Sequence, residues 1–168
     1  MNTETYSWDE IDTIIQRYSS TLYKIAYSYT GSKEDSEDVL QEVFIKYANE
    51  KNFKNEEHKK AWLIRVTINK SINIVKSAHR RKVVPLGEKE IGILDELNNT
   101  QNDSDMKNIV LELPLKYRAV IFLYYYEGYK VEEIAAILNK KTTSVYTLLR
   151  RGRDLLKKNI EEGDGING

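Results

Sequence analysis

Apolar side chains recur at intervals of three and four residues along most of this chain, and that periodicity limits its possible folds more than any other feature. The first stripe consists of Ile11, Ile14, Ile15, Tyr18, Leu22, Ile25 and Ala26. Such spacing indicates amphipathic helices, whereas the alternation that indicates strands is weak throughout. We therefore predict an all-α fold. The expected helices span residues 8–29, about 33–49, about 56–80, 105–113, 115–126, 130–138 and 142 to about 158.

The helical pattern breaks once in the interior, at residues 83–103. This segment contains Pro85, Gly87, Gly92 and several Asn and Asp residues, and it shows little periodicity. Such a composition is typical of a flexible linker between domains, and 168 residues leave room for two small domains. The predicted organisation is a helical domain at 1–82, a flexible acidic linker at 83–103, a second helical domain at 104–160 and a disordered tail at 161–168.

The composition argues against several classes of protein. Without cysteine the chain has no disulfide, thiolate ligand or cysteine nucleophile, and His58 and His79 do not have metal-ligand spacing. We therefore expect no metal and no cofactor, and we find no constellation of catalytic groups that would make the chain an enzyme. The polar start does not resemble a signal peptide, and no apolar stretch is long enough to insert into a membrane, so we expect a cytoplasmic location.

Charge is distributed in alternating blocks, although 26 basic and 26 acidic residues cancel overall. Residues 1–50 carry four basic and ten acidic side chains, whereas residues 51–82 carry ten basic and two acidic ones. Residues 83–108 are again acidic, and residues 109–168 are slightly basic. The pattern suits a protein with one basic macromolecular partner and one polyanionic partner.

Residues 130–158 have the layout of a helix-turn-helix. A short helix at 130–138 and a turn at 139–141 precede a helix with polar and basic residues on its outer face, and the segment holds eight basic and three acidic side chains. Such a helix can enter the major groove of DNA, although a simple three-helix unit with a solvated basic face has the same periodicity. The candidate DNA-contacting residues are Thr142, Thr143, Ser144, Tyr146, Thr147, Arg150 and Arg151.

Two blocks of the chain together resemble the extracytoplasmic-function sigma factors. The segments 113–120, 126–135 and 145–155 look like region 4 of that family, and Glu37–Phe44 looks like its region 2.2. Phe53, residues 61–66 and Asn69 resemble regions 2.3 and 2.4. The resemblance covers about residues 8–82 and 104–158, and it implies a region 2 helical bundle joined to a region 4 helix-turn-helix.

The resemblance assigns the first of these blocks to polymerase binding. Asp38, Gln41 and Glu42 match the helix that grips the coiled coil of the polymerase's largest subunit in the family. Helical spacing places Ile45 on the same face, in an acidic part of the chain. The alternative is that this face is merely charged and solvated.

The same resemblance assigns recognition of the −10 promoter element to the loop after Phe53 and the helix that follows. In the family this loop and the position of Asn69 capture a flipped base, whose unstacking costs a few kcal/mol. At Asn73 many relatives carry Asp, and Trp62 lies at an apolar helical position, which favours core packing over base stacking. The −10 candidates are Phe53, Lys54, Asn55, Arg65, Asn69 and Asn73.

In the second block, Tyr146, Arg150 and Arg151 match the family positions that face the −35 element. Arg150 stands where some relatives carry an aromatic residue, so the sequence that this helix reads can differ from theirs. Arg118 and either Lys140 or Lys141 are candidate phosphate contacts.

The resemblance implies a subunit that binds core RNA polymerase and promoter DNA, helps to melt the promoter, is a monomer when free and is inhibited by an anti-sigma factor. It also implies that the linker enters the RNA exit channel of the polymerase. The main alternative is a stand-alone helix-turn-helix regulator that dimerises on a palindromic site. Two others are a recombinase-like enzyme with a DNA-binding domain and a sigma-like regulator of toxin or bacteriocin genes.

Overall fold

The computed structural model describes residues 6–50, 52–81 and 110–166, with side chains for all of these except 79–81 and 161–166. Helices are the only regular secondary structure in these ranges, so the predicted all-α class is confirmed. The chain divides into two compact units, Met1–Glu90 and Ile91–Gly168. The predicted linker at 83–103 lies outside the described residues, and so does the prediction that it enters an exit channel.

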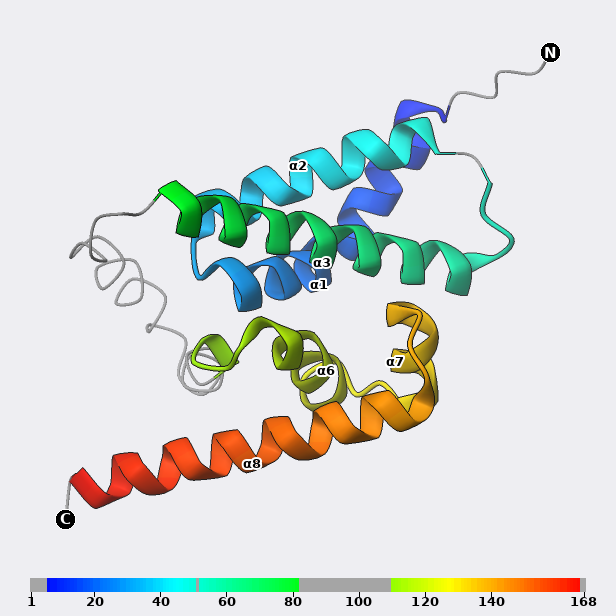
Figure 1. The fold of residues 1–168 in the computed structure, drawn as a ribbon. Helices are drawn as coiled ribbons and strands as arrows, with labels where there is room; N and C mark the ends of the chain where they lie inside the picture. Colours follow the sequence, from blue (N-terminus) through cyan, green and yellow to red (C-terminus); the bar gives the residue numbers. More distant parts are fainter. Residues whose placement is uncertain (1–5, 51, 82–109, 167–168) are drawn as a thin grey trace. The chain divides into compact units, whose positions relative to one another are not determined.

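The first unit is a bundle of three helices, α1 (Trp8–Thr30), α2 (Lys33–Asn49) and α3 (Glu56–Arg81). Each packs against the other two, and α2 and α3 run antiparallel with α1 crossing them (Figure 1). Its core contains the fully buried Leu22, Ile25, Val43 and Leu63. The periodicity of apolar residues correctly predicted these three helices because each needs one buried stripe.

Local capping sets the ends of α1 and the start of α2. The Ser7 hydroxyl accepts a hydrogen bond from the Glu10 amide while the Glu10 carboxylate accepts one from the Ser7 amide, which forms a capping box. Gly31 adopts a φ of 62° and donates its N–H to the Tyr27 carbonyl, and this left-handed conformation ends α1. Ser32 then caps α2 by accepting a hydrogen bond from the Asp35 amide.

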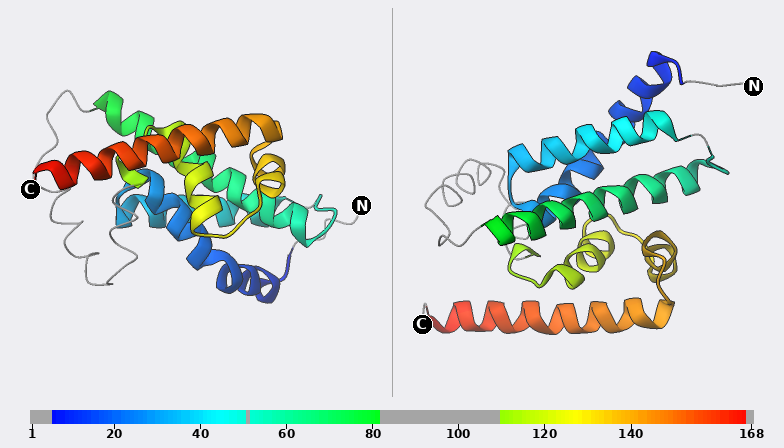
Figure 2. Two further views of the ribbon diagram at one scale, coloured as in Figure 1. Left: turned by 90° about the horizontal axis from the view of Figure 1, so that it is seen from below. Right: turned by 45° about the horizontal axis from the view of Figure 1, so that its top comes forward.

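The second unit contains α6 (Leu115–Tyr125), α7 (Val131–Leu138) and α8 (Thr142–Ile166). Asn139 has a φ of 54° and forms the left-handed turn between α7 and α8. Both α6 and α7 pack against α8, whose C-terminal end projects beyond α6 (Figure 2). The two helices joined by this short turn are the predicted helix-turn-helix.

The C-terminal end of α8 differs from the prediction. We expected the helix to end near Lys158 and residues 161–168 to form a disordered tail, but α8 continues to Ile166. A helix that is already nucleated gains one hydrogen bond for each residue added, and this segment contains no proline that would break it. Its glycines lower helix propensity without terminating the helix.

Arg118, a candidate phosphate contact, makes hydrogen bonds within its own unit. The guanidinium is half-buried and donates from Nε to the Leu113 carbonyl at 2.7 Å and from Nη2 to the Leu111 carbonyl at 2.6 Å. These carbonyls belong to the turn that precedes α6. Arg118 therefore holds the turn against α6.

Gly152 allows α8 and α6 to approach closely. A Cβ atom added at this position would lie 2.9 Å from both Cγ1 and Cδ1 of Ile121, whose side chain is fully buried. Glycine is therefore required for packing here rather than for backbone conformation.

We expect Gly152→Ala to destabilise the second unit by about 1–3 kcal/mol, because the added methyl group overpacks a closed interface. At an exposed helical site the same change would stabilise by up to about 1 kcal/mol, so the sign of the effect is informative. Urea unfolding followed by circular dichroism measures it, with Asp154→Ala at an exposed position of α8 as the control. A variant as stable as the parent would contradict the close approach.

Candidate functional site

The exposed side of α2 carries all four residues assigned to partner binding. They are Asp38, Gln41, Glu42 and Ile45. The opposite side of the helix is buried and includes Val39 and Val43. Ile45 is 65 % exposed although it is apolar, and it lies beside acidic and amide groups. The structure thus brings these four residues onto one outward face that combines negative charge with a hydrophobic contact, which suits a basic protein surface.

An ion pair links this face to α3. The Lys70 ammonium lies 3.2 Å from the Glu42 carboxylate, and both side chains are partly exposed. Lys70 follows Asn69, one of the predicted DNA-reading residues. Sequence reasoning assigned Lys70 no role, because a single lysine within a basic block gives no distinguishing signal.

An aromatic cluster built around Tyr47 supports the loop between α2 and α3. The buried Tyr47 ring stacks on Tyr6 at 5.0 Å and on Phe53 at 5.7 Å between ring centroids. Trp62 meets Phe53 edge-on at 5.3 Å and also contacts Tyr47. Trp62 is half-buried within this cluster, in agreement with the expectation of packing, and Phe53 anchors the loop by its ring.

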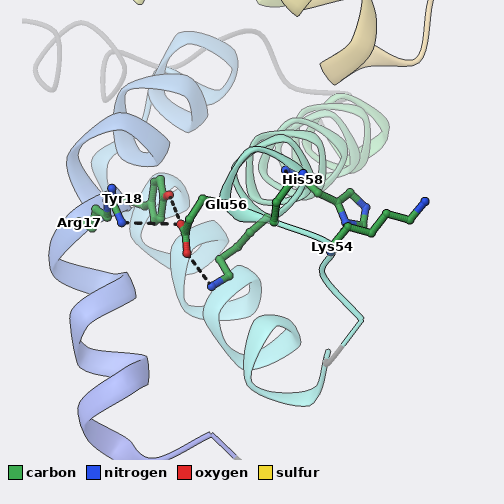
Figure 3. Close-up of polar contacts among 7 residues, drawn as sticks. Arg17, Tyr18, Lys54, Glu56 and His58 are labelled. Carbon is green, nitrogen blue, oxygen red and sulfur yellow. Dashed lines mark hydrogen bonds and ion pairs between the residues drawn. The ribbon is translucent and has the colours of Figure 1, made fainter.

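Asn55 caps α3. Its side-chain oxygen accepts a hydrogen bond from the His58 amide at 2.8 Å, and Nδ1 of His58 accepts one from the Lys54 amide at 3.1 Å (Figure 3). The side-chain oxygen of Asn55, one of the −10 candidates, thus provides an acceptor for an amide at the start of α3. Lys54 remains exposed, and its side chain extends away from α3 (Figure 3).

Glu56, the first residue of α3, joins that helix to α1. Its carboxylate accepts from the Tyr18 hydroxyl at 3.2 Å and lies 3.1 Å from the Lys59 ammonium and 3.7 Å from the Arg17 guanidinium (Figure 3). The hydrogen bond from Lys59 is the largest cause that lowers the pKa of Glu56, and the nearby positive charges and Tyr18 act in the same direction against a smaller desolvation effect.

Because its pKa is lower in the folded state, Glu56 stabilises the fold at pH values above 4.5, the usual pKa of a glutamate. That contribution disappears as the pH falls through the lower folded-state value. The side chain is 55 % exposed, so solvent screening limits the effect to no more than about 1 kcal/mol. We expect Glu56→Gln to lower the stability of the first unit at neutral pH, and the difference to vanish in acid. Urea titrations at several pH values measure this, and a constant difference would contradict the assignment.

The outer surface of α3 carries the other −10 candidates. Arg65, Asn69 and Asn73 follow one another at four-residue intervals, with Arg65 half-buried and both asparagines exposed. Asparagine is a poor helix former, and neither position contributes to the core, so the helix itself gains nothing from these amides. They are available to read a base edge.

The structure does not bring all six −10 candidates together. Asn55 precedes α3, and Asn69 lies 14 residues further along. At a rise of 1.5 Å per residue the two are about 20 Å apart along the helix axis. A single base cannot touch both residues, so the loop and the Arg65–Asn69–Asn73 stripe are separate candidate surfaces. The rise per residue would already have indicated this separation in the sequence.

The predicted recognition face of α8 points outward. The side chains of Thr143, Ser144, Tyr146, Arg150 and Arg151 are exposed, whereas Thr142 and Thr147 are half-buried. The Thr147 hydroxyl donates to the Thr143 carbonyl of its own helix at 3.0 Å. The other side of the helix is buried through Val145 and Leu149. A shallow hollow on the exposed face is lined by Lys140, Thr143, Ser144, Thr147 and Leu148.

Other site types find no support in the described ranges. Among residues 6–78 and 110–160, no group of three or more histidine or carboxylate side chains is arranged to hold a metal ion. Within the part of the chain that the structure describes, no helix is both long and apolar enough to cross a membrane. The candidate sites are the exposed faces of α2 and α3 in the first unit and the exposed face of α8 in the second.

Known proteins share both halves of this arrangement. Residues 14–81 match the family described as Sigma-70 region 2, and residues 105–156 match Sigma-70, region 4. RNA polymerase sigma factor SigV of Bacillus subtilis (strain 168) is 27 % identical over 154 residues, covering 90 % of this chain and 92 % of that protein. ECF RNA polymerase sigma factor SigW of the same organism is also 27 % identical, over 172 residues, covering 92 % of this chain and 90 % of that one.

A solved structure has the same fold. It is the sigma factor RpoE in complex with the anti-sigma factor NepR from Bartonella quintana, with a TM-score of 0.65 and 16 % identity. The match covers 91 % of this chain and 98 % of that chain.

Proposed function

The chain belongs to the extracytoplasmic-function sigma factors, and we propose that it binds core RNA polymerase and directs initiation at promoters whose −35 and −10 elements its own residues read. One observation carries the proposal. Each of the two matched regions turns outward a set of side chains that its own packing does not need, namely the acidic face of α2, the Asn69 stripe of α3 and the basic face of α8.

We propose that Asp38, Gln41, Glu42 and Ile45 bind the polymerase. A partly apolar, acidic helix face can hold a basic helical surface through charge complementarity around a central hydrophobic contact. On binding, Glu42 gives up its ion pair with Lys70 and contacts the polymerase instead. Lys70, on the neighbouring helix α3, is then available to contact DNA.

The two DNA-reading parts of the first unit then divide the −10 element between them. Lys54 and the loop held by Phe53 meet one nucleotide, and Asn69 with Asn73 reads another about 20 Å away. Arg65 lies between them on the same helix and supplies a positive charge for a phosphate. The contacts made with melted bases at both places offset the free energy that unstacking these bases costs.

The face of α8 accounts for recognition of the −35 element. Arg150 and Arg151 are exposed on consecutive positions and can pair with guanine, while Thr143, Ser144 and Tyr146 lie nearer the start of the helix, where base edges are met. Lys140 and Lys141 are exposed in the preceding turn and can contact phosphates.

The zero net charge fits a subunit rather than an independent DNA-binding protein. Phosphate contacts supply most nonspecific DNA affinity, and a polymerase provides them in large numbers. We propose that the free chain is a cytoplasmic monomer that is neither an enzyme nor a stand-alone regulator, and that an anti-sigma factor holds it inactive by covering these faces.

The test mixes the purified chain with bacterial core RNA polymerase and genomic fragments of the source organism. Size-exclusion chromatography detects the complex, and run-off transcription identifies the promoters it opens. A complex that starts transcription at new sites is the expected result. Tight binding to a palindromic site by a dimer without polymerase would instead identify a stand-alone regulator.

A further inference from the structure

We propose that His58 is a positioning residue, which holds the Phe53–Asn55 loop in the conformation that captures a melted base. The inference rests on the proposed function, because it assigns a task to a residue that acts on DNA only through that loop. Nothing in the composition or the motifs singled out His58 beyond its lack of metal-ligand spacing.

The first support is a reciprocal pair of hydrogen bonds. Nδ1 of His58 accepts from the Lys54 amide at 3.1 Å, and the His58 amide donates to the Asn55 side chain at 2.8 Å. Both connect the first turn of α3 with the loop that precedes it (Figure 3). In the usual capping box a glutamate or glutamine at this helical position reaches back to the capping residue. Here the shorter imidazole reaches one residue further, into the loop itself.

The second support is the contact between rings. The half-buried His58 ring lies 5.8 Å from the Phe53 ring in an edge-on arrangement, and Phe53 is in turn packed against Tyr47 and Trp62. The loop is therefore anchored at one end by an aromatic ring and at the other by the cap. His58 contacts both anchors.

The consequence for binding concerns entropy. A loop that is already ordered does not lose conformational freedom when a nucleotide binds, so more of the contact energy appears as affinity. Because the Lys54 amide is engaged by His58, the backbone is fixed while the Lys54 side chain stays exposed and extends away from α3 (Figure 3). This direction leaves its ammonium group accessible to a phosphate.

Two substitutions separate the hydrogen bond from the bulk of the ring. His58→Leu retains a branched apolar side chain but has no acceptor. His58→Asn places its carbonyl oxygen at the same bond distance from the backbone as Nδ1, so it can accept from the Lys54 amide. The two variants therefore differ mainly in whether residue 58 can accept a hydrogen bond from the Lys54 amide.

The measurement uses the complex with core polymerase. One probe is the fluorescent single strand covering the segment melted in a promoter found by the run-off assay, and a second is its duplex −35 segment. We expect His58→Leu to weaken binding of the single strand by about fivefold to tenfold, and His58→Asn to restore most of it. Polymerase affinity and binding of the duplex probe are expected to stay unchanged in both variants.

Three outcomes would overturn the proposal. His58→Leu could bind the single strand as tightly as the parent, or His58→Asn could be as weak as His58→Leu. Equal losses for polymerase and for both probes would show that His58 serves only the stability of the unit. If the parent chain itself forms no complex with polymerase, the proposed function falls together with this inference, which distinguishes that failure from the other three.

Discussion

Replacing Tyr47 with alanine is expected to destabilise the first unit by about 3–5 kcal/mol, the largest effect on stability that we predict for this chain. The side chain is 1 % exposed and stacks on Tyr6 and Phe53, and the Trp62 ring packs against it at a tilt. Alanine would leave a cavity bordered by three aromatic rings that come from different parts of the chain. Because these rings cannot all move inward together, the cavity can collapse only in part.

The two tryptophans make this prediction straightforward to measure. Trp62 contacts Tyr47, whereas Trp8 is 85 % exposed, so a change of fluorescence on unfolding reports mainly on the cluster. Both lie in the first unit, and circular dichroism follows the helices of both units in the same urea titration. A shift in the circular dichroism signal without a shift in the fluorescence midpoint would contradict the prediction.

Tyr47→Phe is the matched control. It keeps the ring in the stack and removes only the hydroxyl, which is hydrogen-bonded to Tyr6. The expected cost is about 1 kcal/mol, typical of one intramolecular hydrogen bond. If phenylalanine were as harmful as alanine, the hydroxyl would be the important group and the packing argument would be wrong.

Sequence periodicity predicted the helices closely where each has a buried stripe and a local stop signal. The first helix was expected at 8–29 and spans Trp8–Thr30, because Gly31 and Ser32 end one helix and begin the next through contacts within a few residues. Where no such signal exists the prediction failed. Nothing near Lys158 ends α8, and the helix continues to Ile166.

The candidate site was predicted best where only one helix face is involved. Spacing alone places Asp38 and Ile45 on one side of α2, and the structure leaves both exposed. Contacts between different helices were harder to predict from the sequence. The close approach of Gly152 to Ile121 depends on the packing of α8 against α6, which no local pattern encodes.

The loop before α3 shows that a motif can identify a segment without separating the structural roles of its residues. Resemblance directed attention to Phe53, Lys54 and Asn55 as one DNA-reading group. In the structure Phe53 is an anchor, Asn55 is a cap, and the side chain of Lys54 alone extends away from the helix. The three residues thus contribute to one surface by different physical means, which a list of matched positions does not separate.

Binding of polymerase and binding of the −35 element are expected to fail independently, because the residues proposed for them lie in different units of the chain. The double variant Asp38→Ala with Gln41→Ala removes a carboxylate and an amide from the exposed face of α2. We expect it to lower polymerase affinity by at least about tenfold, since central interface residues commonly cost more than 1 kcal/mol each. Asp12→Ala is the control, because it removes a negative charge from an exposed position of α1, outside the Glu37–Phe44 block.

Arg151→Ala is expected to have the opposite effect. It should leave polymerase binding intact and weaken recognition of the duplex −35 segment by about 1–3 kcal/mol, the discrimination carried by a bidentate arginine–guanine pair. Lys158→Ala removes a positive charge from an exposed position two turns further along α8 and is the matched control. Both affinities are measured at one fixed salt concentration, because phosphate contacts make binding depend on salt.

The separation of the two effects is the decisive result. If the double variant and Arg151→Ala were each defective in polymerase binding alone, α8 would contact the enzyme rather than the −35 element. If Lys158→Ala weakened duplex binding as much as Arg151→Ala, the basic side of α8 would act through its total charge, and no base-specific contact by Arg151 would be needed. If the double variant loses only polymerase affinity, Arg151→Ala loses only duplex affinity, and both controls retain both affinities, then α2 must provide one surface for the polymerase and α8 another for DNA.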